Sequence, residues 1–268
     1  KAVDSTLSRR SRAGLRLGTR PGVEAAHPAR RGETSTTRYL HAGRLDSDIL
    51  VQVDSRHHYA GIVPTLGWVV LTTGDRPEAL RRAVQSLLDQ QDVEHVVVYA
   101  NGCSIDDVRG SLPESVRPTL GGSDVNLGVP GGRDAALDLL DQSVDLVGFL
   151  DDDAELLTDG VARALGGLFD DPGVAAVSMR LLDEAGESAR RHVPRVGSGS
   201  ADEAGDVATF LGGASVLRRS AYREVGGYWV DLFYGHEELD LAWRLADRGY
   251  RIVYEPTLAV FHPYTEIS

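Results

Sequence analysis

From Trp68 onward the chain alternates short apolar runs with stretches in which apolar residues recur at helical spacing. Residues 68–73 (WVVLTT) are a continuous apolar and β-branched run, which is typical of a strand buried on both faces. Pro77 then suits a first helical turn, and apolar residues three and four apart follow it. The same patterns predict further strands at 95–99, 146–150 and 174–179, and further helices at 133–140, 159–169 and 236–248. This alternation indicates an α/β protein with an open, mostly parallel, twisted sheet and helices on both faces.

Polar residues directly follow three of the predicted strands. Residues 72–73 (Thr-Thr) end the first strand, Asn101 follows the second, and residues 151–153 (Asp-Asp-Asp) follow the third. In open α/β sheets, ligands bind at the carboxyl ends of the strands. These side chains therefore mark one candidate ligand site.

The aspartate triplet needs a compensating charge, because adjacent carboxylates repel one another. A hard divalent cation such as Mg²⁺ binds one or two carboxylates together with phosphate oxygens. Asp151 and Asp153 can leave an extended turn on the same side, so that one binds a metal while the other orients a ribose or a second phosphate. The triplet alone is also open to a solvated acidic loop that caps the following helix.

The helix predicted at 236–248 carries two adjacent glutamates in its first turn. Its apolar face is formed by Leu241, Ala242 and Leu245. At 100° per residue, Glu238 lies in line with that face, whereas Glu237 falls on the solvent face. A glutamate on an apolar face is either a charge favoured by the helix dipole or a carboxylate positioned to accept a proton. The face geometry favours Glu238 over Glu237 as a general base.

The composition and the net charge of the chain argue against one class of function, the binding of nucleic acids. The chain has 268 residues, of which 42% are hydrophobic and 25% charged, as in ordinary globular proteins. Residues 1–66 carry 11 Lys/Arg against 6 Asp/Glu, whereas residues 67–268 carry 17 against 34. The acidic body would repel phosphates, so we expect no nucleic-acid partner.

The cysteine content and the hydropathy of the chain indicate where in the cell the protein is located. The single Cys103 excludes an internal disulfide framework and a multi-cysteine zinc site, and we interpret it as a small turn residue and not as a nucleophile. No stretch approaches the roughly 20 apolar residues of a transmembrane helix. We expect a cytoplasmic protein without a transmembrane segment, and contact with the inner face of the membrane stays open.

The first 66 residues form a separate part of the pattern. Residues 1–38 show no clear hydrophobic period, and residues 36–41 and 49–53 are compatible with a short hairpin. We therefore divide the chain into an N-terminal arm at 1–66 and a main domain at 67–268. Because the two parts have opposite net charge, we expect the arm to lie against the main domain or against a second copy, as in a homo-oligomer.

Five segments carry motifs in a fixed order: VVLTTGDRPEALRRAVQSLL at 69–88, NLGVPGGRDAAL at 126–137, GFLDDDAEL at 148–156, FLGGASVLRRSAYREVGGY at 210–228 and HEELDLAWRLADRGYRIVYEP at 236–256. Together they resemble the inverting family 2 glycosyltransferases of the GT-A fold, over residues 67–262. The resemblance implies a Rossmann-like GT-A domain and an enzyme of hexosyltransferase type that serves glycan or glycoconjugate synthesis. Such an enzyme moves a sugar from a nucleotide-diphosphate donor to a hydroxyl of a glycan, lipid-linked or small-molecule acceptor, with inversion and with Mn²⁺ or Mg²⁺.

The resemblance also implies a role for individual residues. Those binding the donor nucleotide and sugar would be Thr72, Thr73, Asp75, Arg76, Asn101, Asn126, Arg133, Asp151, Asp152, Gly212 and Gly213. The metal ligands would be Asp151, Asp153 and His262, although a single histidine after a strand is also typical of a structural residue. The acidic pair that supplies the base would be Glu237 and Glu238.

The resemblance also places some of these residues within the donor site, and two positions depart from the family pattern. Asp152 would lie near the ribose, Arg133 near the diphosphate or the base, and the glycine pair at 212–213 would let the donor sugar approach the backbone. Ala100 stands where many relatives carry an aspartate that contacts the base, and Glu238 stands where aspartate is common.

Two other interpretations stay open. A sugar nucleotidyltransferase would share the α/β plan and the metal, but it would be expected to carry a glycine-rich phosphate loop that residues 72–77 (TTGDRP) lack. A non-catalytic module that binds sugar nucleotides is the other, and the intact acidic triplet and acidic pair argue against it.

Overall fold

The computed structural model describes residues 64–263 apart from 91–92, 94, 113–117 and 196–198. The strands are β1 (Leu66–Thr72), β2 (His95–Asn101), β3 (Thr119–Ser123), β4 (Leu146–Asp151), β5 (Glu155–Leu156), β6 (Val174–Leu182), β7 (Gly205–Val207), β8 (Ala214–Arg218) and β9 (Arg251–Phe261). The helices are α1 (Pro77–Leu88), α2 (Ile105–Ser111), α3 (Gly128–Leu137), α4 (Val161–Phe169), α5 (Arg219–Glu224) and α6 (Glu237–Asp247), with short 3₁₀ turns η1 (Arg190–His192) and η2 (Val230–Leu232).

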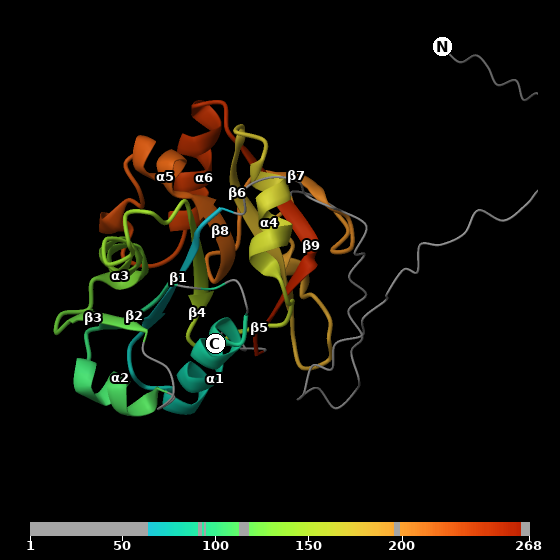
Figure 1. Ribbon diagram of the computed structural model, residues 1–268. Coiled ribbons are helices and arrows are strands. Elements are labelled where there is room, and N and C mark those ends of the chain that lie inside the picture. Colours follow the sequence, from blue (N-terminus) through green and yellow to red (C-terminus); the bar gives the residue numbers. More distant parts are fainter. Residues whose placement is uncertain (1–63, 91–92, 94, 113–117, 196–198, 264–268) are drawn as a thin grey trace, which may run out of the picture. The chain divides into compact units, whose positions relative to one another are not determined.

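All nine described strands join one sheet in the order β3-β2-β1-β4-β8-β6-β9-β5, and β7 pairs with β9 beside that path (Figure 1). Strands β1 to β4 are mutually parallel, β8 runs antiparallel between β4 and β6, and β9 is parallel to β6. Strands β5 and β7 run antiparallel to β9. Six of the nine described strands therefore share one direction, which confirms the expected open, mostly parallel sheet.

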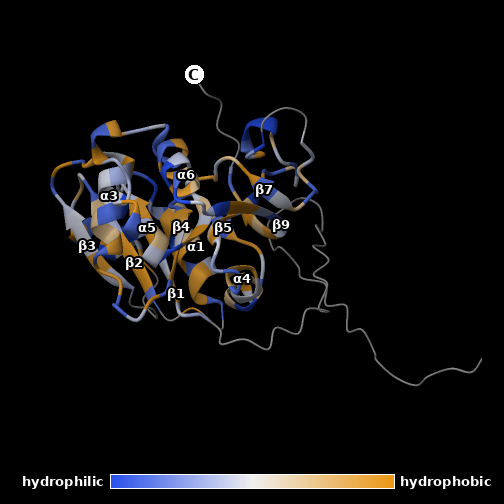
Figure 2. Cartoon of the chain, turned by 90° about the horizontal axis from the view of Figure 1, so that it is seen from above, coloured by the Kyte–Doolittle hydropathy of each residue, from blue (hydrophilic) through white to orange (hydrophobic). Residues whose placement is uncertain are grey.

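Each face of the sheet buries its own hydrophobic core. Helices α1, α2 and α4 pack on one face, where Trp68 and Val70 of β1 are fully buried. Helices α3, α5 and α6 cover the other face, to which Val69 belongs. Figure 2 shows the hydrophobic colours gathered on the central strands β1, β2 and β4. Successive residues of β1 thus face opposite cores, as the continuous apolar run predicted.

The strands and helices predicted from Trp68 onward are present, and one helix begins earlier than expected. The pattern predicts a helix from residue 133, but α3 begins at Gly128. Gly128 adopts φ 73°, which favours glycine, and the Val129 N–H donates to the Phe233 carbonyl at 2.7 Å. The start of α3 is therefore fixed by a contact with a distant loop, which local spacing does not reveal.

The division at residue 66 stays a prediction, because the N-terminal arm and its expected hairpin lie outside the described residues. No helix in the described part of the chain is both long and apolar enough to cross a membrane.

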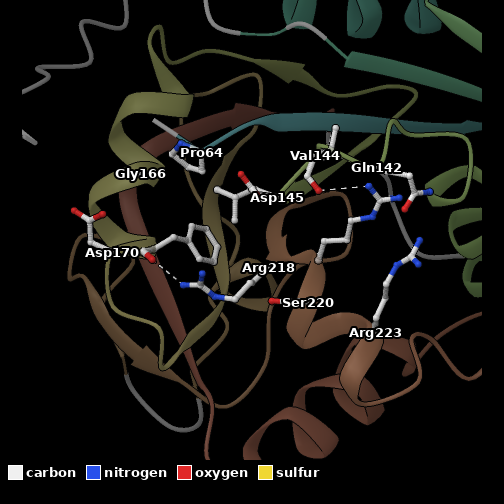
Figure 3. A pocket seen from close by; sticks show the side chains of 12 residues that line it. Pro64, Gln142, Val144, Asp145, Gly166, Asp170, Arg218, Ser220 and Arg223 are labelled. Atoms are coloured by element: carbon white, nitrogen blue, oxygen red, sulfur yellow. Dashed lines mark hydrogen bonds between the residues drawn. The ribbon is translucent and has the colours of Figure 1, made fainter. Parts of the chain in front are cut away.

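A cavity of about 460 Å³ lies at the amino end of β4, opposite the carboxyl ends of the parallel strands (Figure 3). Two buried or half-buried arginines line it, and their guanidinium groups donate to backbone carbonyls. Arg218 donates to the carbonyls of Phe169, Asp171 and Val174, and Arg219 to those of Leu140, Asp141 and Val144. Arg218 ties the turn after α4 to the end of β8, and Arg219 ties the turn before β4 to the start of α5, so the role of both arginines is structural.

Candidate active site

A cleft of about 500 Å³ opens at the carboxyl ends of β1, β2 and β4, where open α/β sheets bind their ligands. It is lined by ten of the residues proposed from sequence: Thr72, Thr73, Arg76, Asn101, Asn126, Arg133, Asp151, Asp152, Asp153 and His262. The other proposed residues are Asp75, Gly212, Gly213, Glu237 and Glu238. The Asp75 side chain is 69% exposed and accepts a hydrogen bond from Thr73, so it lies on the outer side of the cleft.

Three side chains in the cleft form a candidate metal centre. Asp151 ends β4, Asp153 lies in the turn that follows, and His262 comes directly after β9. His262 Nε2 lies 3.4 Å from Asp153 Oδ1 and 3.7 Å from Asp151 Oδ2, and one ligand atom from each residue lies within 4.8 Å of the others. Two carboxylates and an imidazole are ligands that suit Mn²⁺, and the carboxylates also suit Mg²⁺.

The aspartate triplet is not a solvated acidic loop. Asp152 is 2% exposed and Asp153 is 8% exposed. Arg76 Nη2 lies 2.7 Å from Asp152 Oδ1, and its Nη1 contacts Asp153 Oδ2. Arg133 Nη2 donates to Asp151 Oδ1 at 2.9 Å. Two arginines from α1's entry and from α3 therefore compensate the charge that three adjacent carboxylates bring into the protein.

The pKa values in this centre are shifted in both directions. Burial would raise the pKa of Asp151, but the nearby His262 and the charge of Arg133 hold it at about 2. Burial and the neighbouring carboxylates raise the pKa of Asp152 to about 6 against the opposing charge of Arg76. Burial would lower the pKa of His262, but Asp151 raises it above its ordinary value. Such opposed shifts within one cleft are typical of functional sites.

The assignment of Glu237 to the solvent face of α6 is wrong. The Glu237 side chain is 4% exposed, whereas that of Glu238 is 23% exposed. Helix α6 begins at Glu237, directly after His236 in the left-handed region at φ 69°. Side chains of a first turn point back toward the N-terminus, so their neighbours come from the preceding loop and from α3 as much as from the helix's own faces. Glu237 is therefore buried beside Arg133.

Arg133 joins the acidic pair to the metal centre. Its Nη1 lies 3.5 Å from Glu238 Oε1 and 3.9 Å from Glu237 Oε1, while its Nη2 binds Asp151. Arg133 is 5% exposed, and its guanidinium packs over the Phe149 ring, 5.6 Å from the ring centroid. One buried cation thus holds carboxylates from β4 and α6 around it.

Burial raises the pKa of Glu238 well above its usual value, and the nearby Glu237 carboxylate adds to this shift against the charge of Arg133. A carboxylate with a raised pKa is a better proton acceptor at neutral pH than an ordinary one. Glu237 Oε2 is buried without a hydrogen-bond partner, whereas Glu238 is partly open to solvent. Of the pair, Glu238 is the carboxylate that an incoming group can reach.

The glycine pair before β8 makes room for these carboxylates. A Cβ at Gly212 would lie 2.5 Å from Arg133 Nη1 and 2.9 Å from Glu238 Cδ. A Cβ at Gly213 would collide with the Asp151 carboxylate. Both glycines are therefore required by the packing of the site's own side chains, and their proposed role in admitting a donor sugar stays a prediction.

Asn101 shapes the cleft through the turn that precedes α3. Its Nδ2 donates to Asn126 Oδ1 and to the Gly128 carbonyl, both at 3.0 Å, and its Oδ1 accepts from the Leu127 N–H at 2.8 Å. Asn126 Oδ1 also accepts from the Gly128 N–H at 2.8 Å. The polar groups of Asn101 are thus used within the protein, so it supports the wall of the cleft.

Two aromatic residues of the cleft were missed by sequence reasoning. Phe233 and Tyr234 line it from the loop between η2 and α6. A third aromatic residue, Tyr228, is buried, and its hydroxyl has no hydrogen-bond partner. The dense aromatic segment YWVDLFY at 228–234, directly before the acidic pair, is the signal that could have found them.

No protein-family model matches the chain. Among characterised proteins, it is similar to the pre-mycofactocin glycosyltransferase of Mycobacterium tuberculosis, with 35% identity over 132 residues. That similarity covers 46% of this chain and 27% of the relative, so the matched region is about a quarter of the relative's length.

Several solved structures have the same fold. The mannosyltransferase PcManGT from Pyrobaculum calidifontis, in complex with GDP-Man and Mn²⁺, matches with a TM-score of 0.59 at 21% identity, over 76% of this chain and 58% of that one. GalNAc-T7 with UDP, GalNAc and Mn²⁺ matches with a TM-score of 0.60 at 13% identity, over 78% and 45%. TarS of S. aureus matches with a TM-score of 0.54 at 15% identity, over 75% and 37%. The chain therefore has the α/β fold of these glycosyltransferase structures, as the resemblance predicted.

Proposed function

We propose that this chain is an inverting glycosyltransferase of family 2 type that moves a sugar from a nucleotide-diphosphate donor to an acceptor hydroxyl with the help of a divalent metal. One observation carries the proposal. A candidate metal centre of three residues lies in a cleft at the carboxyl ends of the strands, and the buried Arg133 that lines this cleft joins Asp151 of that centre to the acidic pair of α6. The relative's name and the Mn²⁺-bound nucleotide or nucleotide sugar in two structures of the same fold support it.

The residues of the metal centre would hold the leaving group's counter-ion. Asp151, Asp153 and His262 would bind Mn²⁺ or Mg²⁺, which would supply positive charge for the departing diphosphate. Arg76 lies at the same edge of the cleft on a half-exposed side chain, so its guanidinium can turn from the aspartates to a phosphate oxygen.

The acidic pair would serve the acceptor side of the reaction. Glu238 would take the proton of the acceptor hydroxyl at a carboxylate oxygen, and the hydroxyl oxygen would attack the anomeric carbon opposite the leaving diphosphate. Arg133 would keep the Glu238 carboxylate in place, and the buried Glu237 carboxylate would keep the pKa of Glu238 high. This single displacement needs no side-chain nucleophile and inverts the anomeric centre.

Turnover assays with UDP-glucose, UDP-N-acetylglucosamine and GDP-mannose test this function. With Mn²⁺ or Mg²⁺ we expect release of nucleoside diphosphate, reversible loss of that release in EDTA, and transfer to an added hydroxyl acceptor. Formation of sugar nucleotide from sugar phosphate and nucleoside triphosphate, with release of pyrophosphate, would indicate a nucleotidyltransferase instead. Binding of the nucleotides without any turnover would indicate a non-catalytic module.

A further inference from the structure

Two exposed aromatic residues line the candidate active site. Phe233 is 52% exposed and Tyr234 is 80% exposed. We call these two residues the aromatic rim. Seven large hydrophobic residues are exposed in the described part of the chain, and four of them lie within residues 229–234. Such a concentration of exposed apolar surface is typical of a binding site.

The backbone that carries the rim is fixed. The Phe233 carbonyl accepts the Val129 N–H at 2.7 Å, and a Cβ at Gly128 would lie 2.7 Å from the Phe233 Cα. Phe233 and His236 have φ values of 57° and 69° and are the two non-glycine residues with positive φ in the described part. Strained backbone of this kind persists where the surrounding structure over-determines it, and it clusters at functional sites. The exposed rings therefore stand on a rigid support.

The rim continues the wall of the cleft. Phe233 and Tyr234 line the cleft together with Arg133, and Glu237 begins α6 three residues after Tyr234. A molecule that packs on these rings would lie in the same cleft as Arg133, which contacts both glutamates of the acidic pair. An acceptor must come close to that pair if Glu238 accepts its proton, so this step rests on the proposed function.

The charge around the rim selects the kind of occupant. The segment 229–243 contains four acidic residues, Asp231, Glu237, Glu238 and Asp240, and no lysine or arginine. Arg244 pairs with Asp240, and Arg133 faces both glutamates and Asp151, so one guanidinium meets three carboxylates and the local charge stays negative. An anionic acceptor or an anionic lipid surface would be repelled here, and surfaces that bind such lipids are basic. A neutral sugar ring offers C–H faces that pack on aromatic rings and hydroxyls that donate to carboxylates.

We propose that the aromatic rim is an acceptor subsite for a neutral sugar ring, which packs on Phe233 and Tyr234 with its reacting hydroxyl directed toward Glu238. The acceptor would thus be a neutral glycan or glycoside. The rim also sets the distance between the bound ring and the acidic pair, because its backbone is held by α3.

Saturation-transfer NMR and titration with cellobiose, chitobiose and mannobiose test the subsite without any turnover. Tyr234→Ala and Phe233→Ala should each weaken binding of the recognised disaccharide by about 5- to 10-fold, the usual scale of a lost aromatic contact. Tyr234→Phe, which keeps the ring, should bind like the wild type. The matched control is Trp243→Ala, because Trp243 is 60% exposed on α6 and does not line the cleft.

Several results would overturn the subsite. One such result is that none of the three neutral disaccharides binds, and another is that the rim and control variants bind equally well. Tighter binding of a glucuronide than of the matching glucoside would also contradict the subsite, as would a change in oligomeric mass in the rim variants. A matching loss of UDP or GDP affinity would show that the rings contact the nucleotide. Nucleotide binding with Mn²⁺ and donor turnover test the proposed function separately, so either can fail while the other holds.

Discussion

Replacing Arg133 with methionine tests whether one buried cation holds the candidate active site together. Arg133 is 5% exposed and lies 2.9, 3.5 and 3.9 Å from oxygens of Asp151, Glu238 and Glu237. At an effective dielectric constant of about 20, two unit charges 3.5 to 4 Å apart attract by about 4 kcal/mol before desolvation. Removing one partner of a buried ion pair usually costs about 3–5 kcal/mol, because the other charge is left uncompensated. We expect Arg133→Met to lower the free energy of unfolding by about that amount at pH 8.

The loss should shrink as the pH falls. Without Arg133, burial and the nearby Glu237 carboxylate raise the folded-state pKa of Glu238 further above the unfolded value, because the cation that opposes both effects is gone. The folded variant then binds more protons than the unfolded chain, so its stability rises as pH falls from 8 toward 5. Urea unfolding followed by circular dichroism at pH 8 and pH 5.5 measures both effects.

The matched control is Arg82→Met. Arg82 pairs with Glu155 at 2.8 Å, but the two side chains are 37% and 25% exposed, and such surface pairs contribute less than about 1 kcal/mol. If Arg133→Met costs no more than this control, or costs the same at both pH values, the guanidinium does not compensate the acidic pair.

Three further predictions concern the metal, the base and the glycine before β8. Asp153→Asn should weaken Mn²⁺ binding by at least about 10-fold in titration calorimetry while circular dichroism stays unchanged, because one of three ligands loses its charge. Glu238→Gln should lower kcat by about 10²-fold or more with little change in donor affinity, and a larger loss in Glu237→Gln would identify the buried glutamate as the base instead. Gly212→Ala should lower kcat by up to about 10²-fold, because the added Cβ displaces the Glu238 carboxylate. The control is Gly110→Ala, which should leave the kinetics unchanged because no atom lies near its Cβ. Unaltered rates in both variants would show that Gly212 is not required by the packing of Glu238.

The central strands could be predicted because their apolar runs are continuous and buried on both faces. Strand β9 could not be predicted in the same way, because Glu255, Pro256 and Thr257 interrupt its apolar pattern. In the structure, the register between β6 and β9 shifts between Met179 and Arg180, opposite this interruption, so the proline falls at an irregularity of the ladder. Strand β3 (TLGGS) gives an equally weak signal, because two of its five residues are glycines, which do not favour strands. Close neighbours in the folded chain leave no room for a side chain at either glycine.

The site was predictable where its residues follow buried strands, and less so where they depend on loops. The carboxylates of Asp151 and Asp153 were placed at the cleft because strand ends meet at one edge of the sheet. The burial of Glu237 was missed, because the helical pattern cannot show what packs over a first turn. The contribution of Phe233 was missed for the same reason, since its position depends on a bond between the loop and α3.

The two arginines of the site differ in burial, and this difference suggests different tasks. Arg133 is enclosed and reaches carboxylates on both β4 and α6, so it can serve as a permanent part of the framework. Arg76 is 46% exposed and contacts Asp152 and Asp153, one of which belongs to the candidate metal centre. Asp153 Oδ2 contacts Arg76 while its Oδ1 faces His262, so Asp153 offers separate oxygens to the guanidinium and to the candidate metal centre. The exposed guanidinium of Arg76 therefore stands beside that centre, whereas the enclosed guanidinium of Arg133 supports it from within.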